Sequence, residues 1–467
     1  MFENKKPLVR NSNTYQRWQH YLEQPISVAP LVVFRIVFGL LMLFSTLRYV
    51  ALGWVDIQLV EPMLHFKYFG FEWIRALPRA GMYTVFAVMA ISALAITLGW
   101  YYRVFTVLFF LSFTYVELVD ITYYLNHYYF VSIVAFLLIW LPANRYFSLD
   151  VYRKPELYRG QIPRWCITVL KIQIAIVYVY AGLAKINTDW LLQALPLAIW
   201  LPAKSSLPLM GPIFQYKITA YAFSWLGMLF DTFIVLGLLF KKTRGLAYLA
   251  VVIFHTLTGL LFQIGIFPIV MIVMVTIFFS PAWHQRCLQH LASLFPNSTG
   301  RQPRTKVISY PQKEKRWSLY FYTVFIFLQL IFPWRYLLYP GNIFWTEEGY
   351  RFSWRVMLME KAGTATFYVK DGQSGKEGAV INHQFLNPHQ EKQMAMQPDL
   401  ILQYARYLRD YYEEQGVQNP SVRAEVWVTL NGRPAELLVN PDIDLSDKRD
   451  SWRPKDWIIP YKASTSR

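Results

Sequence analysis

Long apolar runs separated by short polar stretches dominate the chain as far as residue 338. A helix needs roughly 20 apolar residues to cross the hydrocarbon core of a bilayer. The pattern therefore predicts a mainly α, polytopic helical membrane protein with about nine spans. We place these spans at residues 31–52, 82–100, 104–119, 128–141, 166–184, 218–240, 246–262, 264–279 and 317–338.

The run at 128–141 is the weak point, because it is only 14 residues long. Such a length is typical of a broken or re-entrant helix that is buried among its neighbours. Whether this run crosses the membrane decides on which side the C-terminal region lies.

Composition and charge support the membrane assignment. Hydrophobic residues make up 55% of the 467 residues and charged residues 16%, whereas soluble proteins carry about 25% charged residues. The net charge of +17 would suggest nucleic acid in a soluble protein. With a cytoplasmic N-terminus, however, the cytoplasmic loops hold 20 Lys and Arg residues and the opposite loops hold 6. This asymmetry sets orientation, so we expect a bilayer as partner, no nucleic acid, and an exoplasmic C-terminal region.

Beyond residue 338 the chain becomes more polar, and the pattern predicts a small extramembrane α+β domain. We expect a strand at 366–370 and an amphipathic helix at 400–414, with a second strand at 422–430, where apolar and polar residues alternate. Asn431-Gly432 then predicts a type I′ turn. The expected domains are a cytoplasmic segment at 1–30, a helical transmembrane domain at 31–338 and the exoplasmic domain at 339–467.

Ionisable residues within apolar runs are candidates for function, because burying them in a membrane is costly. The chain has Arg35, Glu117, Asp120, Lys171, Lys185, Asp231 and His255 in or beside such runs. Asp231 and His255 raise the possibility of an ion-coupled transporter. Against a transporter, the chain shows no repeated halves and no paired broken helices.

Lys185 has the most informative surroundings. Helical spacing places Tyr178, Ala181 and Gly182 on its face, where small residues leave room for a flat ligand. Lost solvation in such a site favours the neutral amine, which can act as a base. The alternative is a lysine at a helix end that pairs with Asp189 four residues later. The residues alone do not decide between the two.

Taken together, these motifs resemble the vitamin K-dependent gamma-glutamyl carboxylase family, whose membrane region is also called the horizontally transferred transmembrane (HTTM) domain. The resemblance begins with Ala181-Gly182-x-x-Lys185 and Asp189-Trp190, and spans nearly the whole chain. The other matching motifs, in order, are Val33-Phe34-Arg35, Phe38-Gly39, Asn126-His127, Ala143-Asn144, Ser148-x-Asp150, Phe254-His255, Gln263-x-Gly265, Phe279-x-Pro281-x-Trp283, Trp345-Thr346, Gly349-Tyr350, Ser353-Trp354, Asp371-Gly372 and Trp427-Val428.

The resemblance implies a membrane enzyme that uses reduced vitamin K, O2 and CO2, and no metal. In the family, a lysine matching Lys185 deprotonates the hydroquinone, which ends as the epoxide, while a protein or peptide glutamate is carboxylated. An apolar pocket would protect a strong base from water. The expected catalytic residues are Lys185 and Asn144. The expected quinone- or substrate-binding residues are Tyr178, Ala181, Gly182, Asp189, Trp190, Asn126, His127, His255 and Arg145.

The sequence departs from the family pattern at two places. The family segment aligned with Ala143-Asn144-Arg145 carries Asn-His, and that histidine is tied to carboxylation, but here the position is Arg145. The expected topology also places Asn144 on the cytoplasmic side, away from Lys185, so these two expectations conflict. The chain also ends soon after the point that matches Ser451-Trp452, as is typical of short bacterial relatives, which implies a bacterial cytoplasmic membrane. Cys166 and Cys287 do not support the family disulfide.

Three functions follow as alternatives. The first is the full carboxylase reaction, and the second is epoxidation of reduced vitamin K without carboxylation. The third is a non-enzymatic quinone or lipid carrier on the same scaffold. An enzyme requires Lys185 for turnover, whereas a carrier requires it for affinity only.

Overall fold

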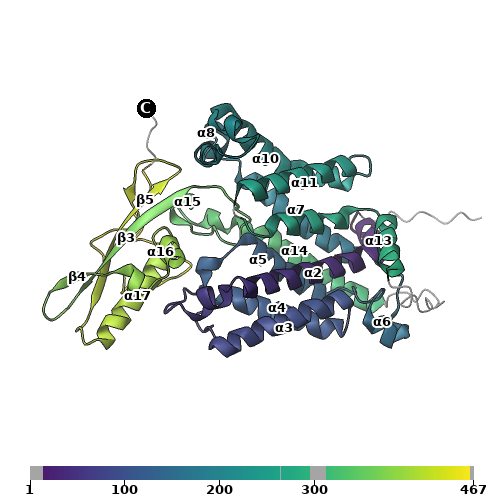
Figure 1. The fold of residues 1–467 in the computed structure, drawn as a ribbon, viewed down its shortest axis with the longest axis horizontal. Helices are drawn as coiled ribbons and strands as arrows, with labels where there is room; N and C mark the ends of the chain where they lie inside the picture. The colour runs from purple at the N-terminus through teal and green to yellow at the C-terminus, as the bar shows by residue number, and fades with distance from the viewer. Residues whose placement is uncertain (1–13, 263, 295–311, 463–467) are drawn as a thin grey trace, which may run out of the picture.

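The computed structural model describes residues 14–262, 264–294 and 312–462, with a helical bundle and a strand-containing C-terminal region at one end (Figure 1). Residues 1–13, 263, 295–311 and 463–467 lie outside this description. The first 13 residues of the expected segment 1–30 and Gln263 of the Gln263-x-Gly265 motif therefore lie outside the description.

Seven helical segments in the described chain are long and apolar enough to cross a membrane. Each coincides with a predicted span to within a few residues. They are α2 (Ala29–Ala51), α3 (Arg79–Leu98), α4 (Tyr102–Val119), α7 (Trp165–Ala184), α10 (Lys217–Leu239), α11 (Arg244–Leu261), and α14 (Gln312–Ile331) with η8 (Phe332–Leu338), which together supply Trp317–Leu338.

The other two predicted spans contain shorter helices, so the count of about nine spans is not confirmed: the described residues give seven helices long enough to cross a membrane, or eight if the bent pair counts as one span. α5 (Asn126–Trp140) is a continuous helix of 15 residues. α12 (Phe267–Met274) continues into the 3-10 turn η6 (Val275–Phe278), and the chain then bends by 116° into α13 (Pro281–Ser293). Pro281 fits this break, because proline starts a helix readily but cannot continue one.

The short helices nevertheless run between the same two ends of the bundle as the long ones. At one end, β1 (Pro25–Ser27) pairs with β2 (Gln161–Pro163), so that α2 and α7 begin side by side; we call this the β1–β2 end. α13 lies there too, since Gln285 Nε2 donates to Ser27 Oγ at 3.2 Å. α5 starts beside the C-terminal region, where Asn126 Nδ2 donates to Arg355 O. The chain after α5 reaches the β1–β2 end, where Arg159 N, just before β2, donates to Arg145 O, and η6 leads directly into α13.

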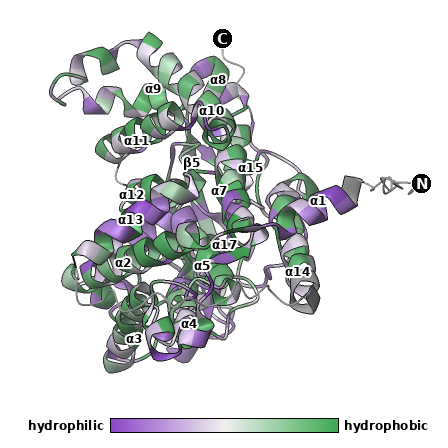
Figure 2. Cartoon of the chain, turned by 90° about the vertical axis from the view of Figure 1, so that its right-hand side faces the viewer, coloured by the Kyte–Doolittle hydropathy of each residue, from purple (hydrophilic) through white to green (hydrophobic). Residues whose placement is uncertain are grey.

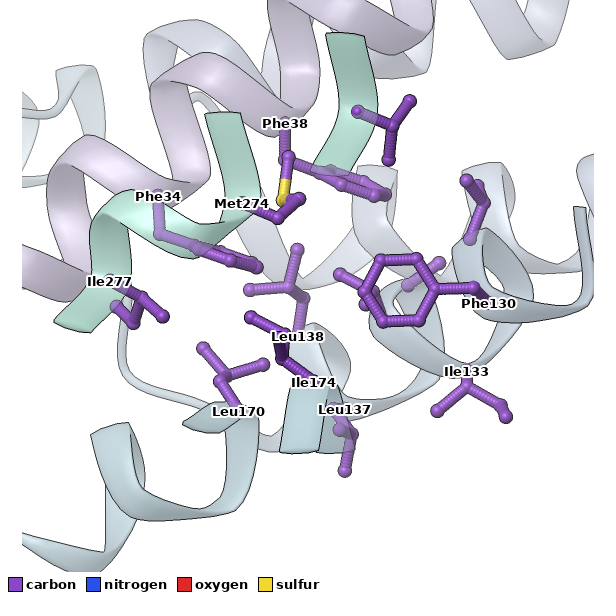
Figure 3. Close-up of a cluster of buried hydrophobic side chains, with 14 of the residues drawn as sticks. Phe34, Phe38, Phe130, Ile133, Leu137, Leu138, Leu170, Ile174, Met274 and Ile277 are labelled. Atoms are coloured by element: carbon purple, nitrogen blue, oxygen red, sulfur yellow. The ribbon is translucent and has the colours of Figure 1, made fainter. Parts of the chain in front are cut away.

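α5 can be short because it lies inside the bundle rather than against lipid. Its Phe130, Ile133, Leu137 and Leu138 pack in one buried cluster with side chains of α2, α7 and α12 (Figure 3). A helix of 15 residues spans only about 22 Å. Such a helix avoids contact with the full thickness of the hydrocarbon core when its neighbours surround it.

The exterior of the bundle is apolar, as a membrane protein requires. Large hydrophobic side chains such as Leu226, Leu246 and Leu260 are exposed on α10 and α11. Figure 2 shows largely hydrophobic colouring on the bundle helices, whereas α13 and α1 (Thr14–Glu23) are more hydrophilic. A hydrophobic outer surface of this extent fits lipid better than water.

The C-terminal region contains a four-stranded antiparallel sheet in the order β4-β3-β5-β6. Two helices pack on this sheet, α16 and the longer α17 (Figure 1). The elements are α15 (Ile343–Thr346), β3 (Lys361–Lys370), β4 (Glu377–Ala379), α16 (Pro388–Met394), α17 (Pro398–Glu414), β5 (Ser421–Leu430) and β6 (Glu436–Leu437).

The predicted elements of this region are confirmed, with longer boundaries. On β5 the apolar set Val422, Ala424, Val426, Val428 and Leu430 is buried, as strict alternation requires of one sheet face. Asn431 and Gly432 both have positive φ, and Arg433 N donates to Leu430 O at 3.2 Å. The turn expected from Asn-Gly is therefore present.

Candidate functional site

A pocket lies where α7 ends, at the end of the bundle that faces the C-terminal region. Its cavity volume is about 110 Å³, compared with roughly 10–15 Å³ needed by one water molecule on the same scale. Side chains from α7, α10, α11 and α12 line it, together with Val356 and Met357 of the C-terminal region. Most of the lining is apolar or aromatic, which is typical of small-molecule sites.

Lys185 and Asp231 supply the charged groups of this pocket. Lys185 Nζ donates to Asp231 Oδ2 at 2.8 Å and to Ala181 O at 3.1 Å, and both charged side chains are buried. The i+4 pairing with Asp189 is wrong, because Asp189 bonds to the C-terminal region instead. Lys185 instead has a buried carboxylate partner, Asp231, which the sequence did not pair with it.

Gly182 explains how α7 and α10 come close enough for that contact. A Cβ atom at Gly182 would lie 2.3 Å from Thr232 Oγ1 and 2.6 Å from Thr232 N. Only glycine allows this approach of two helix backbones. Gly182 therefore does not line the pocket; it places Asp231, the neighbour of Thr232, opposite Lys185.

His255 and Tyr178 form a second polar pair in the wall. His255 Nε2 and the Tyr178 hydroxyl are 2.7 Å apart. His255 Nδ1 is buried without a hydrogen-bond partner in the described residues. An unpaired polar atom in apolar surroundings is costly, so a hydrogen bond from a ligand to this nitrogen would remove that cost.

Trp190 closes the pocket beside the amine. Its ring centroid lies 5.3 Å from Lys185 Nζ, within range of a cation–π contact. The indole Nε1 donates to Ser224 O at 2.8 Å, and Trp190 O accepts a bond from Ser224 Oγ. Trp190 stands in the first turn of α8 (Thr188–Gln193), which Asn187 caps by accepting from Trp190 N at 2.9 Å.

Asp189 points away from the pocket and into the C-terminal region. Arg433 Nη2 and Nη1 donate to its two carboxylate oxygens at 2.6 and 2.8 Å, and Asn431 Nδ2 donates at 2.6 Å. Burial by itself would raise the pKa of Asp189, but the bonds from Arg433 and Asn431 outweigh it and lower that pKa. Asp189 thus joins α8 to the C-terminal region and does not line the cavity.

Asn126 and His127 lie at the pocket end of α5, next to the cavity but outside its lining. The His127 ring contacts Phe267, with centroids 5.6 Å apart, and Phe267 in turn contacts His255 at 5.7 Å. Asn126 Nδ2 donates to Arg355 O at 2.9 Å, two residues from Met357 in the pocket wall. One aromatic ring therefore separates His127 from the site.

Asn144 and Arg145 lie at the opposite end of the bundle. Asn144 Nδ2 donates to Asp150 Oδ2 at 2.8 Å, and Asp150 also accepts from the first amides of α4. Arg145 O accepts from Arg159 N, just before β2. Since β2 leads into the start of α7 and Lys185 follows its end, about 30 Å of helix separates Asn144 from Lys185. The expected pairing of Asn144 with Lys185 is wrong, and Asn144 lies away from Lys185, as the expected order of spans placed it.

The pocket also contains residues that were not expected there. Asp231 stood out as an ionisable residue within a span, but it lies 46 positions from Lys185 and only the fold pairs them. Trp200, in α9 (Leu197–Trp200), and Met357 had no sequence signal. No group of three or more His, Cys, Asp or Glu side chains that could hold a metal ion occurs within the described ranges.

The fold and site together define a polytopic helical membrane protein whose C-terminal region covers a buried, lysine-containing pocket. Comparison with protein families agrees with this class and names the family. Residues 23–283 match the HTTM domain, and residues 314–464 match the vitamin K-dependent gamma-carboxylase lumenal domain. The chain belongs to this HTTM and vitamin K-dependent gamma-carboxylase family, as the resemblance predicted. No solved structure matches the chain.

Proposed function

We propose that the protein is a vitamin K-dependent gamma-carboxylase-like enzyme of the bacterial cytoplasmic membrane, with its C-terminal region on the exoplasmic side. The observation that carries the proposal is the apolar pocket in which a buried lysine and aspartate meet. When bound, reduced vitamin K with O2 supplies the strong base for removing a glutamate γ-proton, and CO2 supplies the new carboxyl group.

The residues of the pocket fit a hydroquinone. A flat aromatic ring suits the apolar and aromatic walls formed by Trp190, Phe254 and Phe267. Two polar positions suit its two hydroxyl groups: Lys185 Nζ and the unpartnered His255 Nδ1. The exclusion of water from such a pocket would protect a basic species from quenching.

Asp231 lets Lys185 act as a base in spite of the ion pair. A proton moved from Nζ to Asp231 Oδ2 over 2.8 Å leaves a neutral amine beside a neutral acid, and no net charge is then buried. The amine can accept a proton from a ligand hydroxyl, and Asp231 can hold the displaced proton until it leaves. Lys185 is thus the proposed base, and Asp231 tunes its protonation.

For carboxylation, we propose Asn126-His127 as the Asn-His pair of the family in place of Asn144-Arg145. Both residues lie at the pocket end of the bundle, and His127 is one aromatic ring away from His255. This assignment removes the objection that Arg145 raised. Asn144 then keeps the structural role that its bond to Asp150 supports.

The test uses the purified full-length protein in detergent or nanodiscs with reduced vitamin K and O2. We expect the 2,3-epoxide to accumulate, and Lys185→Ala to abolish this turnover. Lys171→Ala is a matched control, because Lys171 lies on the same helix outside the pocket, 5.5 Å from the Phe278 ring. Labelled bicarbonate with a glutamate peptide separates the full reaction from epoxidation alone.

A quinone carrier is the second candidate, because the pocket by itself explains quinone binding. A carrier would bind the quinone without consuming O2, and Lys185→Ala would change only its affinity. Equal turnover by wild type and Lys185→Ala would remove the proposed role of the lysine.

A further inference from the structure

The turn between β5 and β6 reaches from the C-terminal region to the wall of the pocket. It consists of Asn431, Gly432 and Arg433 and packs against the segment 188–200, which follows α7. A Cβ atom at Gly432 would lie 3.1 Å from Ile199 Cδ1. No position of this turn lines the cavity, so its contribution to the site must be indirect.

Arg433 and Asn431 hold the segment through Asp189. Arg433 binds both carboxylate oxygens, at 2.6 and 2.8 Å, and also donates to Gln193 Oε1 at 3.2 Å. Asn431 Nδ2 adds a third bond to Asp189 at 2.6 Å. A bidentate arginine–carboxylate pair fixes direction as well as distance. Asp189 therefore sets the orientation of α8, whose next residue, Trp190, closes the pocket over Lys185.

Asn431 is also linked to Trp200, the second tryptophan in the wall of the pocket, through Glu360. Its backbone N donates to Glu360 O at 2.7 Å, and its Oδ1 accepts from Glu360 N at 2.8 Å. The Glu360 carboxylate in turn accepts a bond from Trp200 Nε1. Trp190 and Trp200 both line the cavity, so one buried asparagine connects to both.

We propose that Asp189, Asn431 and Arg433 form a clamp by which the C-terminal region positions Trp190 and Trp200 around Lys185. Arg433 and Asn431 are positioning residues: they touch no reacting group but hold the two indoles that shape the site. The effect on turnover rests on the proposed function. The effect on the order of segment 188–200 does not.

The experiment compares Arg433→Ala and Arg433→Lys with a matched control, Arg423→Ala. Arg423 stands on β5, the strand that leads into the turn, and it also binds a carboxylate through two nitrogens, at 2.8 and 2.7 Å. Its partner is Glu377 on β4, away from the pocket. The readouts are amide hydrogen exchange of the segment 188–200, affinity for phylloquinone, and kcat and KM with reduced vitamin K. Unfolding temperatures show which variants are folded.

We expect Arg433→Ala to speed exchange in 188–200 and to lower kcat on the order of 10- to 100-fold, since a misplacement of about 1 Å can cost that much. Arg433→Lys should fall between Ala and wild type, because lysine cannot make the bidentate contact. Arg423→Ala should change neither readout.

Unchanged exchange in 188–200 in folded Arg433→Ala would overturn the clamp. Faster exchange with wild-type kcat, KM and quinone affinity would overturn its positioning role. If wild type itself shows no turnover, the proposed function fails. Amide exchange in 188–200 and affinity for phylloquinone, compared between wild type and Arg433→Ala, then still test the clamp.

Discussion

The surroundings of Lys185 could be predicted from the sequence only in part. The small residues on its helix face correctly indicated a pocket, because Ala181 and Tyr178 line the cavity with it. Its partner could not be read from the sequence, since Asp231 lies on a different helix. Gly182 was expected at the ligand, but its lack of a side chain serves the crossing of α7 and α10.

The Lys185–Asp231 pair predicts different effects for two conservative substitutions. Asp231→Asn keeps the size and a hydrogen-bonding oxygen but cannot accept the lysine proton, so we expect kcat to fall by on the order of 10² to 10⁴. Asp231→Glu should retain part of the activity, because it keeps the carboxylate. Single-turnover epoxide formation measures both. Wild-type rates in Asp231→Asn would show that Asp231 takes no proton.

Gly182 predicts a packing defect that can be measured without any substrate. Gly182→Ala would place a methyl group against the backbone of Thr232, within 2.6 Å of its N atom. We expect a loss of about 1–3 kcal/mol from overpacking and a lower unfolding temperature. Gly245→Ala on α11 is the control, because a Cβ there has no neighbour within 4 Å. Equal unfolding temperatures for the two variants would contradict the close crossing.

At the scale of elements, apolar length predicted most of the fold. Seven predicted spans correspond to helices long enough to cross, and β5 and α17 follow their apolar periodicity. The two predicted spans that lack a full-length helix, α5 and α12 with η6, share one cause. Hydropathy records apolar residues but does not show whether lipid or other helices surround them, and both short segments have buried faces inside the bundle.

Two candidate Asn dipeptides flank α5: Asn126-His127 is in its first turn and Asn144-Arg145 follows its last residue, Trp140. Their positions at opposite ends of the bundle separate their predicted roles. We expect His127→Ala to reduce bicarbonate incorporation into a glutamate peptide more than epoxide formation, because His127 lies beside the pocket. Asn144→Ala should change both activities equally, and only through stability, since Asn144 bonds to Asp150 at the far end. Bicarbonate incorporation and epoxide formation, both assayed on one preparation of each variant, give the ratio of the two activities. Selective loss of carboxylation in Asn144→Ala would restore the original assignment.

At the scale of the molecule, the covering of the bundle by the C-terminal region could not be predicted. The sequence indicated two domains, yet contacts such as Gln390 Nε2 to Asp120 Oδ2 at 2.8 Å and Asn431 to Asp189 join residues more than 240 positions apart. Such contacts depend on the tertiary arrangement, which local patterns do not encode. The pocket is consequently a joint product of both regions, with Val356 and Met357 among its lining.

Two half-buried arginine–aspartate pairs in and beside the C-terminal region predict how its packing depends on pH. Arg351 Nη1 lies 2.5 Å from Asp399 Oδ2, and Arg433 binds Asp189. Burial would raise the pKa of Asp399, but Arg351 outweighs it and lowers that pKa, as Arg433 and Asn431 lower the pKa of Asp189. Aspartates with a lowered folded-state pKa contribute stability that is fully present above their unfolded pKa of about 3.9.

That contribution is therefore lost as pH falls below about 4 through the folded-state values, while the arginines stay charged throughout. We expect amide exchange, corrected for its intrinsic pH dependence, to rise in 188–200 and around Asp399 between about pH 4 and 2, before the interior of the bundle opens. Arg433→Ala should lose most of this pH dependence in 188–200 and keep it around Asp399. A pH response in 188–200 that is the same in wild type and Arg433→Ala would mean that another group joins the two regions.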